Sequence, residues 1–223
     1  MKYPVSDTQL QLIVGSMLGD GYFVRSQRTR GNPTLRWRHG IAQESYLAWK
    51  YSMLGDLAGS GIKYQTTTCY GKKHECCYAV SKTSEKFNPF VELGGKPTKV
   101  SRKLLNLLSP LGLAIWYMDD GCLDRSYYTN KHGVRKIARL RALLCTHGYS
   151  LEEHYIMQRY FKVVWGLDVA IHRDGNKYRL TFNRTNAMKL FEIIEEHIHP
   201  SMLYKIQAKE LGQNALPPQN IEE

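Results

Sequence analysis

The chain has 223 residues, with 31 Lys and Arg against 20 Asp and Glu, so its formal net charge at pH 7 is +11. This length allows one large domain or two small ones with a substantial hydrophobic core. No apolar run approaches the roughly 20 residues that span a bilayer, and residues 1–7 lack the apolar core of a signal peptide, so we expect an intracellular protein without a membrane partner. A basic globular protein of this kind most often binds a polyanion, nucleic acid first among them; simple solubility is the alternative.

The cysteines predict neither zinc binding nor a disulfide framework. They are odd in number and contain no Cys-x-x-Cys pair: Cys69, Cys76, Cys77, Cys122 and Cys145. Adjacent residues on a strand point to opposite faces, which separates Cys76 from Cys77. We expect all five to be reduced.

The N-terminal half reads as helix, hairpin, helix, hairpin, helix. Ser6 or Asp7 can cap the first helix, and apolar and aromatic residues recur at helical spacing from Glu44 to Ala58, before a stop at 59–61. Gly40 is a candidate bulge in the second strand. The expected helices cover 10–18, 44–58 and 84–93, and the expected strands cover 22–30, 34–43, 62–70 and 75–83.

The same order repeats in the C-terminal half, after a linker at 94–98. Pro110 suits the first turn of a helix, and Ser150 with Glu153 forms a capping-box pattern. The expected helices cover 102–108, 110–120, 150–165 and 184–199, and the expected strands cover 122–129, 134–146, 167–173 and 177–183. The chain therefore divides into a repeat at 1–96, a linker with a short helix at 97–109, a second repeat at 110–207 and a loose tail at 208–223.

An apolar helical run that ends in an acid and a glycine occurs twice. Residues 13–21 read Ile-Val-Gly-Ser-Met-Leu-Gly-Asp-Gly, and residues 113–121 read Leu-Ala-Ile-Trp-Tyr-Met-Asp-Asp-Gly. The terminal acids are Asp20 and Asp120. An acid at a helix C-terminus opposes the helix dipole, so two such acids favour a functional role. We expect the two helices to pack side by side and to bring the two carboxylates together.

These features resemble the LAGLIDADG homing endonucleases, of the single-chain type with two motif copies. The resemblance covers about residues 10–206. The second motif is the stronger match, because it keeps Leu113-Ala114 and Asp120-Gly121, whereas the first keeps Gly15 and Asp20-Gly21. The resemblance implies an α+β fold of two pseudo-symmetric αββαββα repeats, with the motif helices packed at the centre and the antiparallel sheets forming a DNA-binding saddle.

The function implied by the resemblance is site-specific DNA cleavage by a monomer, with one phosphodiester hydrolysed per strand of a long asymmetric target. Asp20 and Asp120 fall on the positions that hold divalent metal, and Mg²⁺ prefers such oxygen ligands. We expect Mn²⁺ to substitute and Ca²⁺ to bind without supporting cleavage. Gly19 and Asp119 are further candidate metal contacts. Asp119 ranks below Asp120, because the residue before the glycine is the acid that both motif copies share. Asp119 lies about 100° around the helix and can face solvent, cap a strand or act electrostatically.

The resemblance adds further active-site candidates. Lys205 lies in residues 200–206, which are similar to the family's Pro-x-Met-x-Tyr-Lys ending. Lys99 is the first-half equivalent, with Lys96 as the second choice. Gln43 ends the second predicted strand, where the family often carries a Gln that orders water. His147 holds the matching place in the second half, so we expect unequal half-sites.

Basic and polar side chains alternate with apolar ones along the predicted strands, which puts them on one face. Arg can bind guanine bidentately and Gln can bind adenine, and acids are scarce in 21–43 and 125–147. In the second half, Arg135, Arg139 and Arg141 share one parity. The candidate DNA-binding residues are Arg25, Arg28, Arg30, Arg36, Arg38, Lys63, Gln65, Arg135, Arg139, Arg141, Lys177 and Arg179.

Two alternatives share this fold: an RNA maturase that assists group I intron splicing, with intron RNA as its partner, and a DNA-binding regulator that has lost cleavage. Retention of both Asp20 and Asp120 favours the nuclease. The sequence shows no splicing nucleophile at residue 1 and no His-Asn ending. We therefore expect an intron-encoded or free-standing enzyme rather than an intein, located in the organelle or prokaryotic cytoplasm that holds the host intron.

Overall fold

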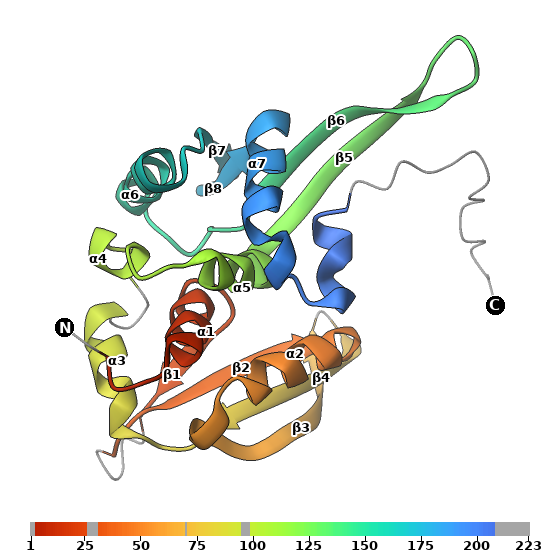
Figure 1. Ribbon diagram of the computed structural model, residues 1–223. Helices are drawn as coiled ribbons and strands as arrows, with labels where there is room; N and C mark the ends of the chain where they lie inside the picture. Colours follow the sequence, from red (N-terminus) through yellow and green to blue (C-terminus); the bar gives the residue numbers. More distant parts are fainter. Residues whose placement is uncertain (1–2, 26–30, 70, 95–98, 208–223) are drawn as a thin grey trace.

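The structure is a computed structural model that describes residues 3–25, 31–69, 71–94 and 99–207. Two four-stranded antiparallel sheets, of strand order β1-β2-β4-β3 and β5-β6-β8-β7, lie on opposite sides of a central helix pair, α1 and α5 (Figure 1). From α1 in the first half and from α5 in the second, the α-helices and strands follow in the same order. The expected α+β architecture of two repeats is therefore confirmed. No helix in the described ranges is both long and apolar enough to cross a membrane.

The first half begins with α1, whose N-cap Ser6 forms a capping box with Gln9. Its elements are α1 (Asp7–Leu18), β1 (Tyr22–Val24), β2 (Thr34–Gly40), the 3-10 turn η1 (Ile41–Gln43), α2 (Glu44–Ser52), η2 (Gly55–Leu57), β3 (Ala58–Cys69), β4 (Lys72–Ser81), η3 (Glu85–Phe87) and α3 (Asn88–Gly94).

The second half begins with the short α4. Pro110 lies in the first turn of α5 and the Ser150–Glu153 capping box forms, both as predicted. Its elements are α4 (Arg102–Leu105), α5 (Pro110–Asp120), β5 (Gly121–Thr129), β6 (Arg135–Leu144), α6 (Leu151–Tyr160), the π turn η4 (Phe161–Trp165), β7 (Val169–Asp174), β8 (Lys177–Phe182), α7 (Arg184–Ile194), η5 (Glu195–His197) and η6 (Pro200–Lys205). The β5–β6 hairpin extends well beyond the body of the molecule (Figure 1).

Several predicted boundaries are wrong. The helix predicted to reach Ala58 ends at Ser52, because Gly55 adopts a positive φ of 53° that a helix does not permit, and residues 59–61 belong to β3. Strand β2 ends at Gly40 with an unbroken register and no bulge, so Gln43 lies in η1 rather than at a strand end. The predicted strand 22–30 forms as β1 over its first residues, and 26–30 lie outside the described residues, as do linker positions 95–98 and the tail 208–223.

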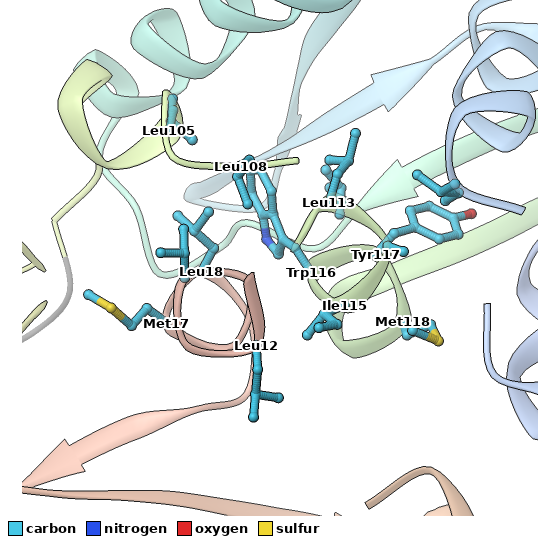
Figure 2. Close-up of a cluster of buried hydrophobic side chains, with 14 of the residues drawn as sticks. Leu12, Met17, Leu18, Leu105, Leu108, Leu113, Ile115, Trp116, Tyr117 and Met118 are labelled. Carbon is cyan, nitrogen blue, oxygen red and sulfur yellow. The ribbon is translucent and has the colours of Figure 1, made fainter. Parts of the chain in front are cut away.

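The interface of α1 and α5 depends on very close backbone approach. A Cβ built on Gly15 would lie 2.5 Å from the Gly112 carbonyl oxygen and 2.9 Å from Ile115 Cβ. The side chain of Gln11 ties the same helices together: it donates to the Leu107 carbonyl (2.9 Å) and accepts from the Ser109 N–H (2.7 Å). Apolar side chains surround the contact, with Leu105 and Leu108 closing one side (Figure 2). The expected side-by-side packing is thus present.

We expect Gly15→Ala to destabilise the protein by about 1–3 kcal/mol, because the added methyl overpacks the contact with α5, even though alanine favours helix by about 1 kcal/mol. Denaturant unfolding measures the difference. Gly40→Ala is the matched control, since no atom lies within 4 Å of a Cβ built there, and it should shift the free energy of unfolding by less than about 0.5 kcal/mol. Equal effects of the two variants would contradict the packing account.

Candidate active site

The two motif acids lie at neighbouring helix ends. Gly19 ends α1, Asp20 follows it, and Asp120 is the last residue of α5. The helices cross closely here too, since a Cβ built on Gly19 would lie 2.5 Å from Asp119 Cβ. The Gly21 N–H donates to the Ser16 carbonyl (2.7 Å), which turns the chain sharply after the acid. The packing therefore brings the C-termini of both motifs to one place.

The electrostatics of Asp20 and Asp120 fit a bound dication. Burial, followed by the charge of Asp119, raises the pKa of Asp20 to about 6. Burial, followed by the charge of Asp20, raises the pKa of Asp120 to about 8. Clustered carboxylates in a partly desolvated site repel one another, and a divalent cation bound by their oxygens removes that repulsion. Because Gly19 has no side chain, the end of α1 can approach Asp119 closely. A metal contact through the Gly19 backbone stays a prediction.

Asp119 does not face solvent, which corrects one of the roles left open for it. Its side chain is fully buried and accepts hydrogen bonds from the Tyr46 hydroxyl (2.8 Å) and the Asp20 backbone N–H (3.1 Å). The Lys50 ammonium lies 2.8 Å from both of its carboxylate oxygens. Ligand atoms of Asp20, His39 and Asp119 lie within 4.8 Å of one another, but the ammonium already neutralises Asp119. Asp119 thus already has a cation partner, and the metal-ligand role of Asp20 and Asp120 stays a prediction.

Lys50 is a site residue that the sequence analysis missed. Its side chain is fully buried, with the ammonium 5.5 Å from the centre of the Trp37 ring and 5.1 Å from that of Tyr46. It joins α2 of the first half to α5 of the second. Its position in the sequence could have identified it. Lys50 follows Tyr46 by four residues and Leu47 by three, which places a charge on the apolar face of an amphipathic helix.

Lys205 lies beside the acids, as its motif predicts. It is buried, and its ammonium donates to the backbone carbonyls of Met118 and Asp119. Burial lowers the pKa of Lys205, while the charges of Asp119, Asp20 and Asp120 oppose that shift. The 3-10 turn η6 thus brings a cation to the end of α5.

Lys99 is exposed, and its backbone N–H donates to the Gly94 carbonyl (2.6 Å). Within the described ranges, no hydrogen bond or ion pair joins Lys99 to Asp20 or Asp120. Its catalytic role stays a prediction, and Lys96 lies outside the described residues. The lysine whose charge acts on both acids from the first half is Lys50.

Gln43 contacts the site through His39. Its side-chain oxygen lies 3.0 Å from His39 Nδ1, which also lies 3.5 Å from an Asp20 oxygen. Burial, followed by the charge of Lys50, lowers the pKa of His39 to about 4, so the ring is neutral at pH 7. In the second half, His147 Nε2 lies 3.0 Å from Asp174. The half-sites therefore differ in structure, while the water-ordering roles of Gln43 and His147 stay predictions.

The sheet of the first half has a basic outer face. In β2, Arg36 and Arg38 alternate with buried Leu35, Trp37 and His39. The register places Arg38 and Lys63 on either side of Tyr78, and the Arg38 guanidinium donates to Gln65 (3.4 Å). The predicted common face is confirmed for these residues. Arg25 instead donates to Asn88 (2.8 Å), and Arg28 and Arg30 lie outside the described residues.

A bulge divides the basic residues of β6. Arg139 pairs with Ser126, but Ile137 pairs with Tyr127, so Ala138 is an extra, unpaired residue. Side chains before this bulge therefore lie on the opposite face of the sheet from the one that simple alternation predicts. The prediction that Arg135 shares a face with Arg139 and Arg141 is therefore wrong. The Arg135 guanidinium lies instead 4.3 Å from the centre of the Tyr127 ring.

On the outer face of the second sheet, Asp124 holds two arginines. It accepts from Arg141 Nε (3.0 Å) and lies 3.3 Å from Arg139 Nε, contacts that lower its pKa, the Arg141 hydrogen bond most. The β7–β8 register places Lys177 opposite Asp174 and Arg179 opposite His172 on this face, as predicted for the two basic residues. The face is thus basic and partly pre-organised by its own acids.

Comparison with known proteins identifies the class. The LAGLIDADG DNA endonuclease family matches residues 10–191, and the chain belongs to this family. The solved structure of the homing endonuclease I-WcaI bound to its DNA recognition sequence shares the fold, with a TM-score of 0.80 at 19% identity over 91% of this chain and 87% of that one.

Two curated relatives are named for different proteins. Protein RecA of Mycolicibacterium chitae is 30% identical over 223 residues, which cover 98% of this chain and 51% of the relative. The probable intron-encoded DNA endonuclease 3 of Mycosarcoma maydis is 31% identical over 114 residues, 51% of this chain and 75% of the relative. The chain thus spans about half the length of its RecA relative.

We expect Asp120→Asn to stabilise the metal-free protein at pH 9 and to have little effect near pH 4. The pKa of Asp120 is about 8 in the folded state against an ordinary 3.8. The folded state therefore keeps a proton that the unfolded state loses, and stability falls as pH rises between these values. Thermal unfolding in a chelator measures the gap. A variant that is less stable than the wild type at pH 9 would show that burial and the neighbouring acids do not raise the pKa of Asp120.

Proposed function

We propose that this protein is a site-specific DNA endonuclease that cuts both strands of a long asymmetric DNA site with divalent metal held by Asp20 and Asp120. The observation that carries the proposal is the meeting of these two carboxylates where α1 and α5 end, between two sheets with basic outer faces. Membership of the LAGLIDADG DNA endonuclease family supports it, as does the I-WcaI complex with its DNA recognition sequence.

Each motif contributes one carboxylate to metal binding, and Mg²⁺ is the expected ion because it favours oxygen ligands and retains water. When bound, the metal supplies an activated water and neutralises charge on the phosphate. Asp20 and Asp120 must both be ionised to hold it, and burial raises the pKa of Asp120 to about 8 in the metal-free protein. Protons therefore compete with the metal, so metal binding should strengthen as pH rises. The Lys205 ammonium is fixed at the end of α5, and it adds positive charge for the incoming phosphate.

The sheets provide the DNA contacts in this proposal. Alternation along β2 and β8 directs basic side chains outward while apolar ones form the core. Phosphate contacts supply affinity, and contacts to base edges supply sequence choice. Asp124 fixes the orientation of the Arg141 guanidinium, which limits how that side chain can approach a base.

We expect Asp20→Asn and Asp120→Asn each to lower Mg²⁺-dependent cleavage by about 10³-fold or more, since a catalytic metal contributes several kcal/mol. The substrate is a site selected from a randomised library or taken from the host allele without the insertion. Both variants should still bind this DNA in Ca²⁺. Asp56→Asn is the matched control, because Asp56 is exposed and pairs with Lys86 instead.

Full cleavage by either variant would remove that acid from the mechanism. If the wild-type protein cuts none of the selected sites and an intron RNA splices faster in its presence, the maturase function would be supported instead.

We expect Arg139→Ala to weaken DNA binding and to reduce the salt dependence by about one unit of slope for each lost phosphate contact. Arg135→Ala is the matched control on the same strand, since the Ala138 bulge turns it to the other face. Binding titrations at several salt concentrations measure both. A larger effect of Arg135 than of Arg139 would show that the outer face is not the DNA-binding face.

A further inference from the structure

The active site contains one more carboxylate than the proposed metal pair requires. Asp20, Asp119 and Asp120 converge, and the charge of Asp119 acts on both of the others. A buried carboxylate without a partner is very unfavourable. Asp119 is nonetheless fully buried, so its compensation by Lys50 is a requirement of the fold.

The surroundings of Asp119 have the composition of a second cation site. His39 Nδ1 lies 3.5 Å from Asp20 Oδ2, and one nitrogen and two carboxylate oxygens from His39, Asp20 and Asp119 lie within 4.8 Å of one another. A mixed set of imidazole and carboxylate ligands suits transition metals such as Mn²⁺ and Zn²⁺. A dication bound there would share Asp20 with the metal proposed for the pair of Asp20 and Asp120.

The ammonium of Lys50 lies against two of these three groups, Asp119 and His39. It lies 2.8 Å from both oxygens of Asp119 and 3.5 Å from His39 Nε2, and it packs near the rings of Trp37 and Tyr46. The lysine stem comes from α2 through the core, so the charge is anchored on the side away from solvent.

We propose that Lys50 acts as a built-in cation that excludes divalent metal from the pocket of Asp20, His39 and Asp119, and so directs metal to Asp20 and Asp120. Lys50 is a positioning residue in this role. The proposal rests on the proposed function only for the second half of that statement, because the excluded pocket does not include Asp120.

The test is Mn²⁺ binding to the DNA-free protein, measured by electron paramagnetic resonance. Lys50→Met removes the charge but keeps much of the chain length, and we expect it to bind about one additional Mn²⁺ per chain. Lys50→Met with Asp119→Asn should lose that gain, because the pocket then lacks its second carboxylate. Lys50→Arg keeps the charge and should bind as the wild type does.

Melting temperatures keep the proposal testable if Lys50→Met folds poorly, since a variant with an unpaired buried Asp119 should then be stabilised by Mn²⁺. The double variant should show no such stabilisation beyond that of the wild type. No additional Mn²⁺ and no metal-dependent rise in melting temperature for Lys50→Met would overturn the proposal.

Asp120→Asn separates this proposal from the proposed function. The additional Mn²⁺ of Lys50→Met should persist when Asp120→Asn is added, because that pocket does not use Asp120. Wild-type Mn²⁺ binding that is insensitive to Asp120→Asn would count against the proposed endonuclease site alone.

Discussion

The close packing of α1 against α5 is the constraint on which the rest of the structure depends. Gly15 lets the backbones meet near Gly112, and Gly19 lets the end of α1 lie against Asp119. A larger side chain at either glycine would separate the two motif ends and the carboxylates that they carry. The same axis fixes the sheets, since β1 follows α1 closely and β5 follows α5 directly. One interface therefore sets both the distance between the acids and the placement of the two basic faces.

The halves are joined by polar contacts that cross this interface. The Tyr149 hydroxyl donates to the Leu18 carbonyl at the end of α1 (3.0 Å), and the Tyr46 hydroxyl donates to Asp119 near the end of α5. Each half thus supports the motif helix of the other. The charges are less symmetric, because Lys50 compensates a carboxylate for which the first motif has glycine, Gly19. The pseudo-symmetry is one of backbone arrangement, and the chemistry of the two half-sites differs.

Local signals predicted most of the fold. Capping residues Ser6 and Ser150, Pro110 and the repeated Asp-Gly endings located the helices, and alternation located the strands. The errors arose where distant contacts decide. The hydrogen-bond partners of Asp119 come from α2 and the end of α1. The sequence of α5 alone could not show these partners, so a solvent-facing Asp119 remained a possible interpretation. The bulge at Ala138 carries no Gly signal, and parity therefore failed for Arg135. Lys50 was visible as a charge on an apolar helix face, but its partner was not.

The central claim is that the two motif acids, rather than Asp119, hold the metal. Anomalous diffraction from Mn²⁺ in crystals of the protein bound to its target DNA tests this most directly. The account predicts manganese within coordination distance of Asp20 and Asp120 oxygens, with the Lys50 ammonium still paired to Asp119. Manganese bound to Asp119 with Lys50 displaced, or bound to neither Asp20 nor Asp120, would contradict it.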